Sequence, residues 1–400
     1  MTRSARRSSA SRSLLLPLAV LVLAAVAGAR ATDPAPAGAA PPVEAPPSAR
    51  QEAPGDSARA MDRGRRLTGW LLAGRSDSVA AVLDSAFRAQ LGGADGVGRF
   101  AVRLDRQLGS ERGVVAEEVF TDRTVHHYYR ISRFERAGDR TVTVHWAWRE
   151  GGPVVGMKVS PTPRPAETGN EGYETKTRLR LPFEDAWYVA WGGRPPRRNY
   201  HARAPDQRFA YDFLVLRDGS SHRGGGRENA DYHCFGRPVL APAPGRVVRA
   251  ADSVPDNVPG EMNQRAIFGN HVVIDHGAGE FSVLAHLRRG SVTVEPGDRV
   301  ERGQRLGACG NSGRSSEPHL HYHLQDGPEP GGATGLPAAF RGYRADGEVV
   351  ERGEPTRGRI VRPASPGAAG RAPSAGTGIA SVQRAGGLVE PFHEAREARP

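Results

Sequence analysis

The segment Glu317-Pro-His-Leu-His-Tyr-His323 alternates histidine with leucine and tyrosine over its last five residues. Successive side chains of a strand point to opposite faces of a sheet, so His319, His321 and His323 are expected on one face. Two imidazoles that are two residues apart on a strand can reach one metal ion, or one metal ion and its bound water. Histidine is too uncommon for three alternate positions to arise easily by chance, which favours a function over a solvent-facing strand edge.

The pattern of short strands extends upstream of this segment. Gly269-Asn-His-Val-Val-Ile-Asp-His276 and Phe281-Ser-Val-Leu-Ala-His-Leu287 read as strands, and most of 199–326 consists of such strands cut by Gly and Pro. The absence of a convincing long helix there predicts an all-β or β-rich domain. Nine of the 13 histidines fall in this part of the chain. Asp212 also begins an apolar run, where a buried carboxylate needs a partner or a metal ion.

Seven motifs follow one another in this region: His201…Asp212, Gly236-Arg-Pro-Val-Leu-Ala-Pro-Ala-Pro-Gly245, 269–277, Ala285-His-Leu287, 294–307, Gly310-Asn-Ser-Gly313 and Pro318-His-Leu-His321. Each is weak alone, but the ordered set is specific. It resembles the M23 family of zinc endopeptidases of the lysostaphin/LytM type, which cut peptide bonds in peptidoglycan. The resemblance covers roughly 181–326. It implies a mainly antiparallel all-β LytM/lysostaphin-type peptidase domain, with a duplicated hybrid motif, over 181–345.

The resemblance also implies the residues of the site. Zn²⁺ would be held by His201, Asp212 and His321, with a fourth position left for water. His286 and His319 would be two unligated catalytic histidines beside the metal. One would orient or deprotonate the water, and the other would stabilise the oxyanion or protonate the leaving amine.

One departure from the family concerns the second ligand. The family places its first His and Asp closer in sequence than the 11 residues that separate His201 from Asp212. Asp206 is nearer but sits in a turn-like context, so we favour Asp212 and keep Asp206 as the alternative. His323 shares the face of His319 and His321, and we expect it beside the ligands or at the rim of the site.

The N-terminus has the composition of an export signal. An Arg- and Ser-rich start precedes the apolar run 14–27 and an Ala-x-Ala cleavage site, which predicts a signal peptide over 1–31. The alternative is an uncleaved signal anchor, although a run of 14 residues is short for a membrane span. No other segment reads as a span. We therefore expect an exported protein, in the periplasm or outside the cell, whose Pro/Ala-rich residues 32–57 form a linker.

The remaining segments are less specific. Apolar residues at helical spacing, followed by strand-like runs, predict an α+β module over 58–161 that resembles the NTF2-like modules found before exported hydrolase domains. His126, His127 and His145 fall on its strands and are expected to be structural. We interpret 162–180 as a linker. The Gly-, Pro- and Arg-rich residues 346–400 predict a disordered tail.

Charge and cysteine content add two constraints. The net charge of +11 includes five Arg in 1–31, whereas 199–345 hold 17 basic and 16 acidic residues. A nucleic-acid binder should show a basic stripe on one module, and the sequence shows none. The two cysteines, Cys234 and Cys309, are an even number in a chain with an export signal. Both a disulfide and two buried thiols remain open at this point.

These observations predict an exported zinc endopeptidase that hydrolyses stem peptides or cross-links of peptidoglycan. The alternative is a non-catalytic wall-binding or activator protein on the same fold. Such degenerate relatives usually lack ligands, whereas all five metal-site and catalytic positions are filled here. The sequence leaves open which peptide bond is cut.

Overall fold

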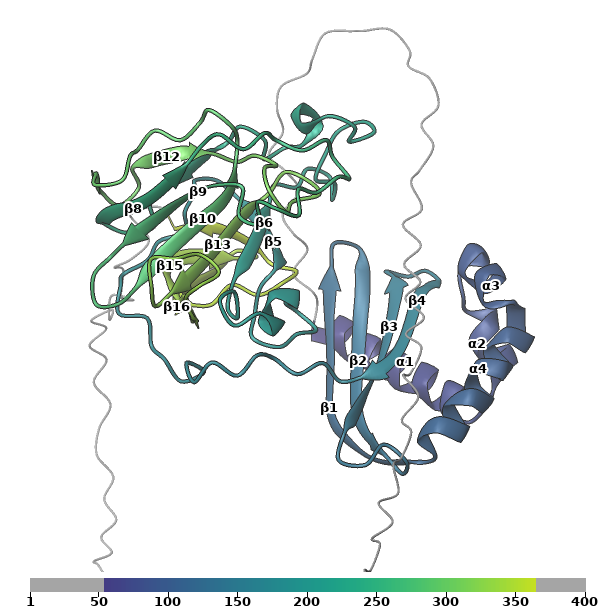
Figure 1. Cartoon of the computed structure of the whole chain (residues 1–400). Coiled ribbons are helices and arrows are strands. Elements are labelled where there is room, and N and C mark those ends of the chain that lie inside the picture. Colours follow the sequence, from purple (N-terminus) through teal and green to yellow (C-terminus); the bar gives the residue numbers. More distant parts are fainter. Residues whose placement is uncertain (1–53, 365–400) are drawn as a thin grey trace, which may run out of the picture. The chain divides into compact units, whose positions relative to one another are not determined.

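The computed structural model describes residues 54–364 (Figure 1). The predicted signal peptide, most of the predicted linker and residues 365–400 of the predicted tail lie outside this range. Among the described residues, no helix combines the length and apolar character needed to cross a membrane. The first helix begins at Pro54, so the last residues of the expected linker are helical instead.

The first part of the described chain is helical because apolar residues recur on one face of each segment. Leu67, Leu71, Val97, Ala101 and Leu104 are all buried in its core. Asp84 caps the third helix by accepting a hydrogen bond from the Ala86 N–H. The helices are α1 (Pro54–Leu72), α2 (Ser76–Ala81), α3 (Ser85–Leu91) and α4 (Gly93–Leu108).

A four-stranded antiparallel meander follows the helices. Trp146 is fully buried against them and donates from Nε1 to the Thr68 hydroxyl at 3.0 Å. His127 and His145 lie on neighbouring strands, as expected of structural residues, with ring nitrogens 3.0 Å apart. Helices packed on a meander are what the sequence predicted here, and the NTF2-like assignment stays a prediction. The strands are β1 (Glu111–Asp122), β2 (Val125–Phe134), β3 (Thr141–Arg149) and β4 (Val154–Pro161).

The remainder of the described chain is β-rich, and its strand pairs are antiparallel. Its helical elements are the 3₁₀ turns η1 (Tyr200–Arg203) and η2 (Asn229–Asp231) among the described residues. The prediction of a mainly antiparallel all-β domain is therefore confirmed. Its strands are β5 (Trp187–Trp191), β6 (Tyr211–Leu214), β7 (Pro238–Leu240), β8 (Gly245–Ala251), β9 (Asn270–Asp275), β10 (Phe281–Leu287), β11 (Arg299–Val300), β12 (Arg305–Ala308), β13 (Leu320–Gln325), β14 (Gly335–Leu336), β15 (Phe340–Ala345), β16 (Glu348–Gly353) and β17 (Ile360–Pro363).

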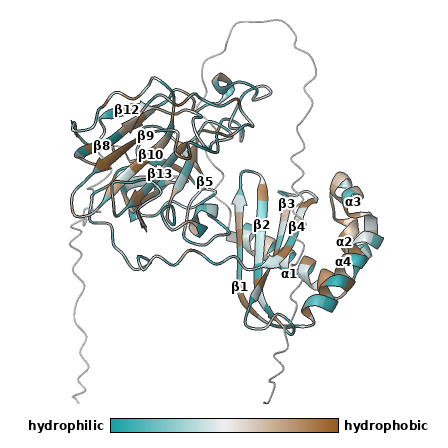
Figure 2. Ribbon diagram, in the orientation of Figure 1, coloured by the Kyte–Doolittle hydropathy of each residue, from teal (hydrophilic) through white to brown (hydrophobic). Residues whose placement is uncertain are grey.

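One large sheet organises this domain. Its strand order is β11-β8-β9-β10-β13-β6-β5-β17-β15-β16, with β14 added to β13, and β12 pairs with β7 in a separate ribbon. The central strands β9 and β10 contain many hydrophobic residues, which are brown in Figure 2. Along β13, Leu320, Tyr322 and Leu324 enter the main core. The histidines that alternate with them occupy the opposite face of the sheet.

The structure corrects the expectation for 346–364. We predicted a disordered tail from 346, but β16 and β17 extend the large sheet as far as Pro363. Val361 is fully buried and pairs with Trp187 of β5. The sequence carried little signal because β16 is largely exposed and has no apolar alternation. The structure thus adds a C-terminal hairpin edge to the predicted domain.

Residues 162–180 contain no helix or strand, but they are attached to the β-rich domain. The fully buried carboxylate of Glu280 accepts hydrogen bonds from the backbone N–H groups of Lys176, at 2.6 Å, and Thr177, at 2.7 Å. Leu179 is part of the main core. The end of the expected linker is therefore a packed segment of the domain that follows it.

Candidate metal centre

Three buried side chains from separate elements meet on the histidine-bearing face of the sheet. His321 on β13 is paired directly with Asp212 on β6, and His201 comes from the 3₁₀ turn η1. Each of the three offers one nitrogen or oxygen, and these atoms lie within 4.8 Å of one another. The structure therefore brings together the three residues that the sequence analysis proposed as ligands.

The Asp212 carboxylate is at the centre of this group. Its Oδ1 lies 2.9 Å from Nδ1 of His321, and its Oδ2 lies 3.5 Å from Nε2 of His201. Burial alone would raise the pKa of Asp212, but the imidazoles of His201 and His319 hold this pKa well below its usual range. Asp212 is therefore a buried anion that requires positive charge nearby.

The two predicted catalytic histidines lie beside the group. The ring centroids of His286 and His319 are 4.7 Å apart, and Nε2 of His319 is 3.6 Å from Oδ1 of Asp212. Burial opposes the charged form of His319, but the Asp212 carboxylate outweighs it and raises the pKa of His319 to about 9. Burial also lowers the pKa of His286 well below its usual range. In the metal-free protein, His319 therefore carries the proton that balances the charge of Asp212, while His286 is neutral.

Hydrogen bonds from the surrounding chain fix how these rings face the centre. Nδ1 of His286 lies 2.8 Å from the Ser312 carbonyl, and Nδ1 of His319 lies 2.8 Å from the Glu317 carbonyl. A carbonyl oxygen cannot donate, so each Nδ1 carries a hydrogen. Nε2 of His286 is consequently an unprotonated nitrogen. In His319, Nε2 is the nitrogen that lies toward Asp212.

His201 is fixed in the same sense by Asn199. The Asn199 amide donates from Nδ2 to the carbonyls of Gly193 and Ala210, so its Oδ1 accepts from Nδ1 of His201 at 3.0 Å. Burial lowers the pKa of His201 to about 3. Nε2 of His201 is therefore unprotonated, and its lone pair lies beside Asp212. A cation would satisfy these lone pairs and the carboxylate together. Two imidazoles and one carboxylate are a ligand set that suits catalytic zinc.

His286 owes its position to an irregularity in β10. The pairing of β10 with β9 shifts register between Leu284 and Leu287, which leaves one extra residue on β10. His286 has a φ of 61°, a left-handed conformation that non-glycine residues rarely adopt. Its backbone N–H donates to the Phe268 carbonyl.

The structure also places the residues that the sequence left open. Asp206 lies outside the ligand group, and its carboxylate accepts from the neighbouring Gln207 amide. His323 is fully buried, with Nδ1 3.0 Å from Nε2 of His321. The Tyr200 hydroxyl, 3.4 Å from Oδ2 of Asp212, had no predicted role. Its position directly before His201 was the available signal.

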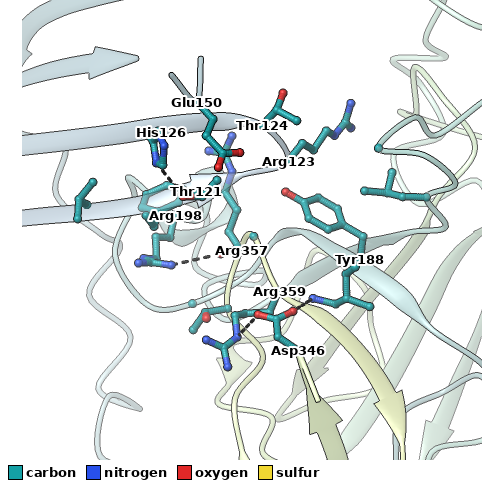
Figure 3. Close-up of a pocket in the computed structure, with 18 of the residues that line it drawn as sticks. Thr121, Arg123, Thr124, His126, Glu150, Tyr188, Arg198, Asp346, Arg357 and Arg359 are labelled. Atoms are coloured by element: carbon teal, nitrogen blue, oxygen red, sulfur yellow. Dashed lines mark hydrogen bonds and ion pairs between the residues drawn. The ribbon is translucent and has the colours of Figure 1, made fainter. Parts of the chain in front are cut away.

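A separate cleft has a lining that contains neither Asp212 nor any of the five histidines just described (Figure 3). Some of its charged side chains contact one another or the backbone. Arg359 contacts Asp346 at 2.8 Å, and Arg198 donates to the Arg357 carbonyl at 3.2 Å. Among residues 54–364, the group of side chains that could hold a metal ion is His201, Asp212 and His321, and it lies outside this cleft.

The comparison with known families agrees with this geometry. The family model described as peptidase family M23 matches residues 227–331. Residues 227–331 are therefore a peptidase family M23 segment. The matched residues include His286, His319 and His321, while His201 and Asp212 precede them.

Two curated relatives contain M23 segments similar to this one. The chain is 48% identical over 56 residues to the peptidoglycan DD-endopeptidase ShyA of Vibrio cholerae, covering 14% of this chain and 13% of ShyA. It is 33% identical over 93 residues to the cell division protein DipM of Caulobacter vibrioides, covering 23% of this chain and 13% of DipM. The chain therefore aligns with about an eighth of the length of either relative.

One solved structure is also similar to part of this chain. The catalytic domain of lysostaphin from Staphylococcus simulans aligns with 37% of this chain and 86% of its own length, at 22% identity and a TM-score of 0.23.

Proposed function

We propose that this protein is an exported zinc-dependent endopeptidase that hydrolyses peptide bonds in the stem peptides or cross-links of peptidoglycan. The observation that carries the proposal is the convergence of His201, Asp212 and His321 on one centre, with His286 and His319 beside it. This arrangement combines a three-residue ligand set with two further imidazoles that are available for proton transfer.

His201, Asp212 and His321 would hold the zinc ion through Nε2, a carboxylate oxygen and Nδ1, respectively. Bound zinc would polarise the scissile carbonyl and bring the pKa of a bound water to about 7. With three protein ligands, a fourth position stays open for water or substrate.

His286 and His319 would perform the proton transfers. An unprotonated Nε2 can take a proton from the attacking water, and a protonated imidazole can stabilise the oxyanion or protonate the leaving amine. Each ring is held at Nδ1 by a backbone carbonyl, so Nε2 of each is the atom that exchanges the proton. The two rings share these tasks because a peptide bond needs both a base and an acid in one turnover.

Peptidoglycan is the proposed substrate because residues 227–331 match peptidase family M23 and 56 residues of the chain are similar to ShyA, whose name describes a peptidoglycan DD-endopeptidase. Export is proposed from the composition of residues 1–31, and it would place the enzyme in the compartment of this substrate.

The test is digestion of purified peptidoglycan by the mature protein, with mass analysis of the released fragments. We expect soluble peptide-containing products that disappear with a chelator and return with zinc. The His319→Ala variant should release none while still binding zinc. Binding of peptidoglycan by a zinc-loaded wild-type protein without any cleavage would overturn the proposal and favour a non-catalytic wall-binding role.

A further inference from the structure

A chain of hydrogen bonds leads away from His321 along the same face of β13. Nε2 of His321 lies 3.0 Å from Nδ1 of His323, and Nε2 of His323 lies 2.9 Å from Oε1 of Gln325. Nε2 of Gln325 then donates to the Gly327 carbonyl at 2.7 Å. The three side chains are at most 2% exposed. The mechanism proposed above uses His321 but neither His323 nor Gln325.

The hydrogen bond from Gln325 to the Gly327 carbonyl sets the donor-to-acceptor direction of all the hydrogen bonds in this series. The Gly327 carbonyl can only accept, so the Gln325 amide must turn its NH₂ group toward it and its Oε1 toward His323. Nε2 of His323 must then carry a hydrogen, which leaves Nδ1 of a neutral His323 as an acceptor. Nε2 of His321 must donate to that acceptor. Nδ1 of His321 is therefore the nitrogen available to the centre, where it lies 2.9 Å from Asp212.

We propose that His323 and Gln325 are positioning residues that hold His321 with its hydrogen on Nε2 and thereby present Nδ1 to the metal ion. This inference rests on the proposed zinc site. A ligating imidazole whose other N–H is hydrogen-bonded is fixed in ring orientation and is a more basic ligand. The series of hydrogen bonds begins at the backbone carbonyl of Gly327 and ends at the proposed metal ligand His321.

The packing of side chains alone does not explain why this series of hydrogen bonds is present. Apolar groups adjoin this face as well, because Val283 pairs with His323 and the Phe268 ring lies 5.7 Å from the His323 ring. Apolar side chains would fill such surroundings without any polar group to satisfy. The polar groups of His323 and Gln325 are instead matched one to one, from a backbone carbonyl to a metal ligand.

The experiment measures zinc affinity in the full mature protein, stripped of metal, by competition with a chromogenic chelator. His323→Leu removes the acceptor for His321, and Gln325→Leu removes the group that orients His323. We expect each to weaken zinc binding by about 10- to 100-fold. His323→Asn keeps an acceptor atom near the position of Nδ1, and should restore affinity close to that of the wild type.

The matched control is Tyr322→Phe, which removes a buried hydrogen bond to Ser282 on the opposite face of the same strand. Thermal unfolding of the metal-free proteins reports any loss of folding. The inference is wrong if His323→Leu and Gln325→Leu bind zinc as tightly as Tyr322→Phe while His321→Ala loses it. If the wild type itself fails to bind zinc, the proposed function fails instead.

A second measurement reads the hydrogen positions directly. Nitrogen-15 spectra of histidine-labelled protein distinguish the two neutral ring forms. We expect His323 in the form with hydrogen on Nε2, both with and without zinc, and His321 protonated at Nε2 in the zinc-bound protein. A His323 ring with its hydrogen on Nδ1 would contradict the direction of the chain, whether or not the variants fold.

Discussion

Asn199 fixes the ring of His201 and anchors it to two separate backbone segments. Its Oδ1 accepts from Nδ1 of His201 at 3.0 Å, and its Nδ2 donates to the carbonyls of Gly193 and Ala210. The Asn199 side chain is fully buried. The stability of the fold and the orientation of one proposed ligand therefore depend on different atoms of the same amide.

These two roles are separable by substitution. Asn199→Asp keeps an oxygen for His201 but cannot donate to the two carbonyls, so we expect a loss of about 1–3 kcal/mol in unfolding free energy with zinc binding retained. Asn199→Leu removes both functions and should also weaken zinc binding. Denaturant unfolding and chelator competition measure the two effects.

Asn270 provides the matched control for Asn199. It is equally buried and its Nδ2 donates to the carbonyls of Val254 and Leu287. Asn270→Leu should destabilise the protein without a specific effect on zinc affinity. Equal effects of the two leucine variants on zinc affinity would show that Asn199 acts only through folding.

The proposed ligands and the proposed proton-transfer residues should behave differently when truncated. His201→Ala, Asp212→Ala and His321→Ala are expected to lose both zinc and hydrolysis, because each removes one of three ligands. His286→Ala and His319→Ala should retain zinc but lose about 10²- to 10⁴-fold in hydrolysis rate. Metal analysis and peptidoglycan digestion on the same preparations check this separation.

Asp206→Ala tests the alternative second ligand. The Asp206 carboxylate contacts Gln207 and lies outside the ligand group, so this variant should keep zinc and activity. Loss of zinc in Asp206→Ala, with zinc retained in Asp212→Ala, would reverse the assignment.

Glu280 should contribute a pH-dependent part of the stability. Burial alone would raise its pKa, but hydrogen bonds from Thr177, Lys176 and Tyr173 outweigh burial and lower the pKa of Glu280. A lowered pKa means that the folded protein holds the proton less tightly than the unfolded chain, whose glutamate pKa is about 4.3. This stability is present above the unfolded pKa and is lost as the pH falls through the lowered folded pKa.

Glu280→Gln should remove that acid dependence and destabilise the protein at neutral pH by about 1–3 kcal/mol, because the amide cannot accept all the hydrogen bonds of the carboxylate. Denaturant unfolding of both proteins from neutral to acid pH measures the difference. The two curves should converge in acid. Parallel curves across the range would show that the pKa of Glu280 is the same in the folded and unfolded states.

Cys234 and Cys309 are expected to form a disulfide once the protein has been exported as proposed. The structure has them as buried free thiols with sulfur atoms 3.0 Å apart, and the Cys234 thiol donates to the Pro318 carbonyl. An oxidising compartment favours closure of such a pair. Cross-linking across a loop of this length would stabilise the fold by about 4 kcal/mol. Mass spectrometry without reduction decides the matter, and two free thiols would end the prediction.

Local rules predicted part of the site, and the resemblance to the M23 family implied the rest, including His201 and His286. Period-two alternation on β13 placed His319, His321 and His323 on one face, and the apolar residues between them are indeed in the core. Asp212 stood out as a charged residue that enters an apolar strand. Strand alternation and the cost of burying charge act locally, so both can be seen in the sequence.

The supporting groups were not predictable because they depend on the register between distant strands. His321 faces Asp212 only because β13 pairs with β6 in one register. Asn199 and Gln325 carry amides that are common in any loop or strand, and their roles follow from carbonyls supplied elsewhere. β16 and β17 were missed for a related reason, since their pairing partners supply the order that their own composition does not indicate.

The bulge at His286 has a consequence for anyone who transplants this centre into a designed protein. A regular strand would not hold this ring as β10 does, because residue 286 occupies the extra position and a left-handed backbone. Copying the histidines onto an ideal sheet would therefore misplace one of the two proposed proton-transfer groups. The irregular backbone of β10 must therefore be copied together with the side chains. A regular β10 strand would remove the proposed proton-transfer role of His286 from the design.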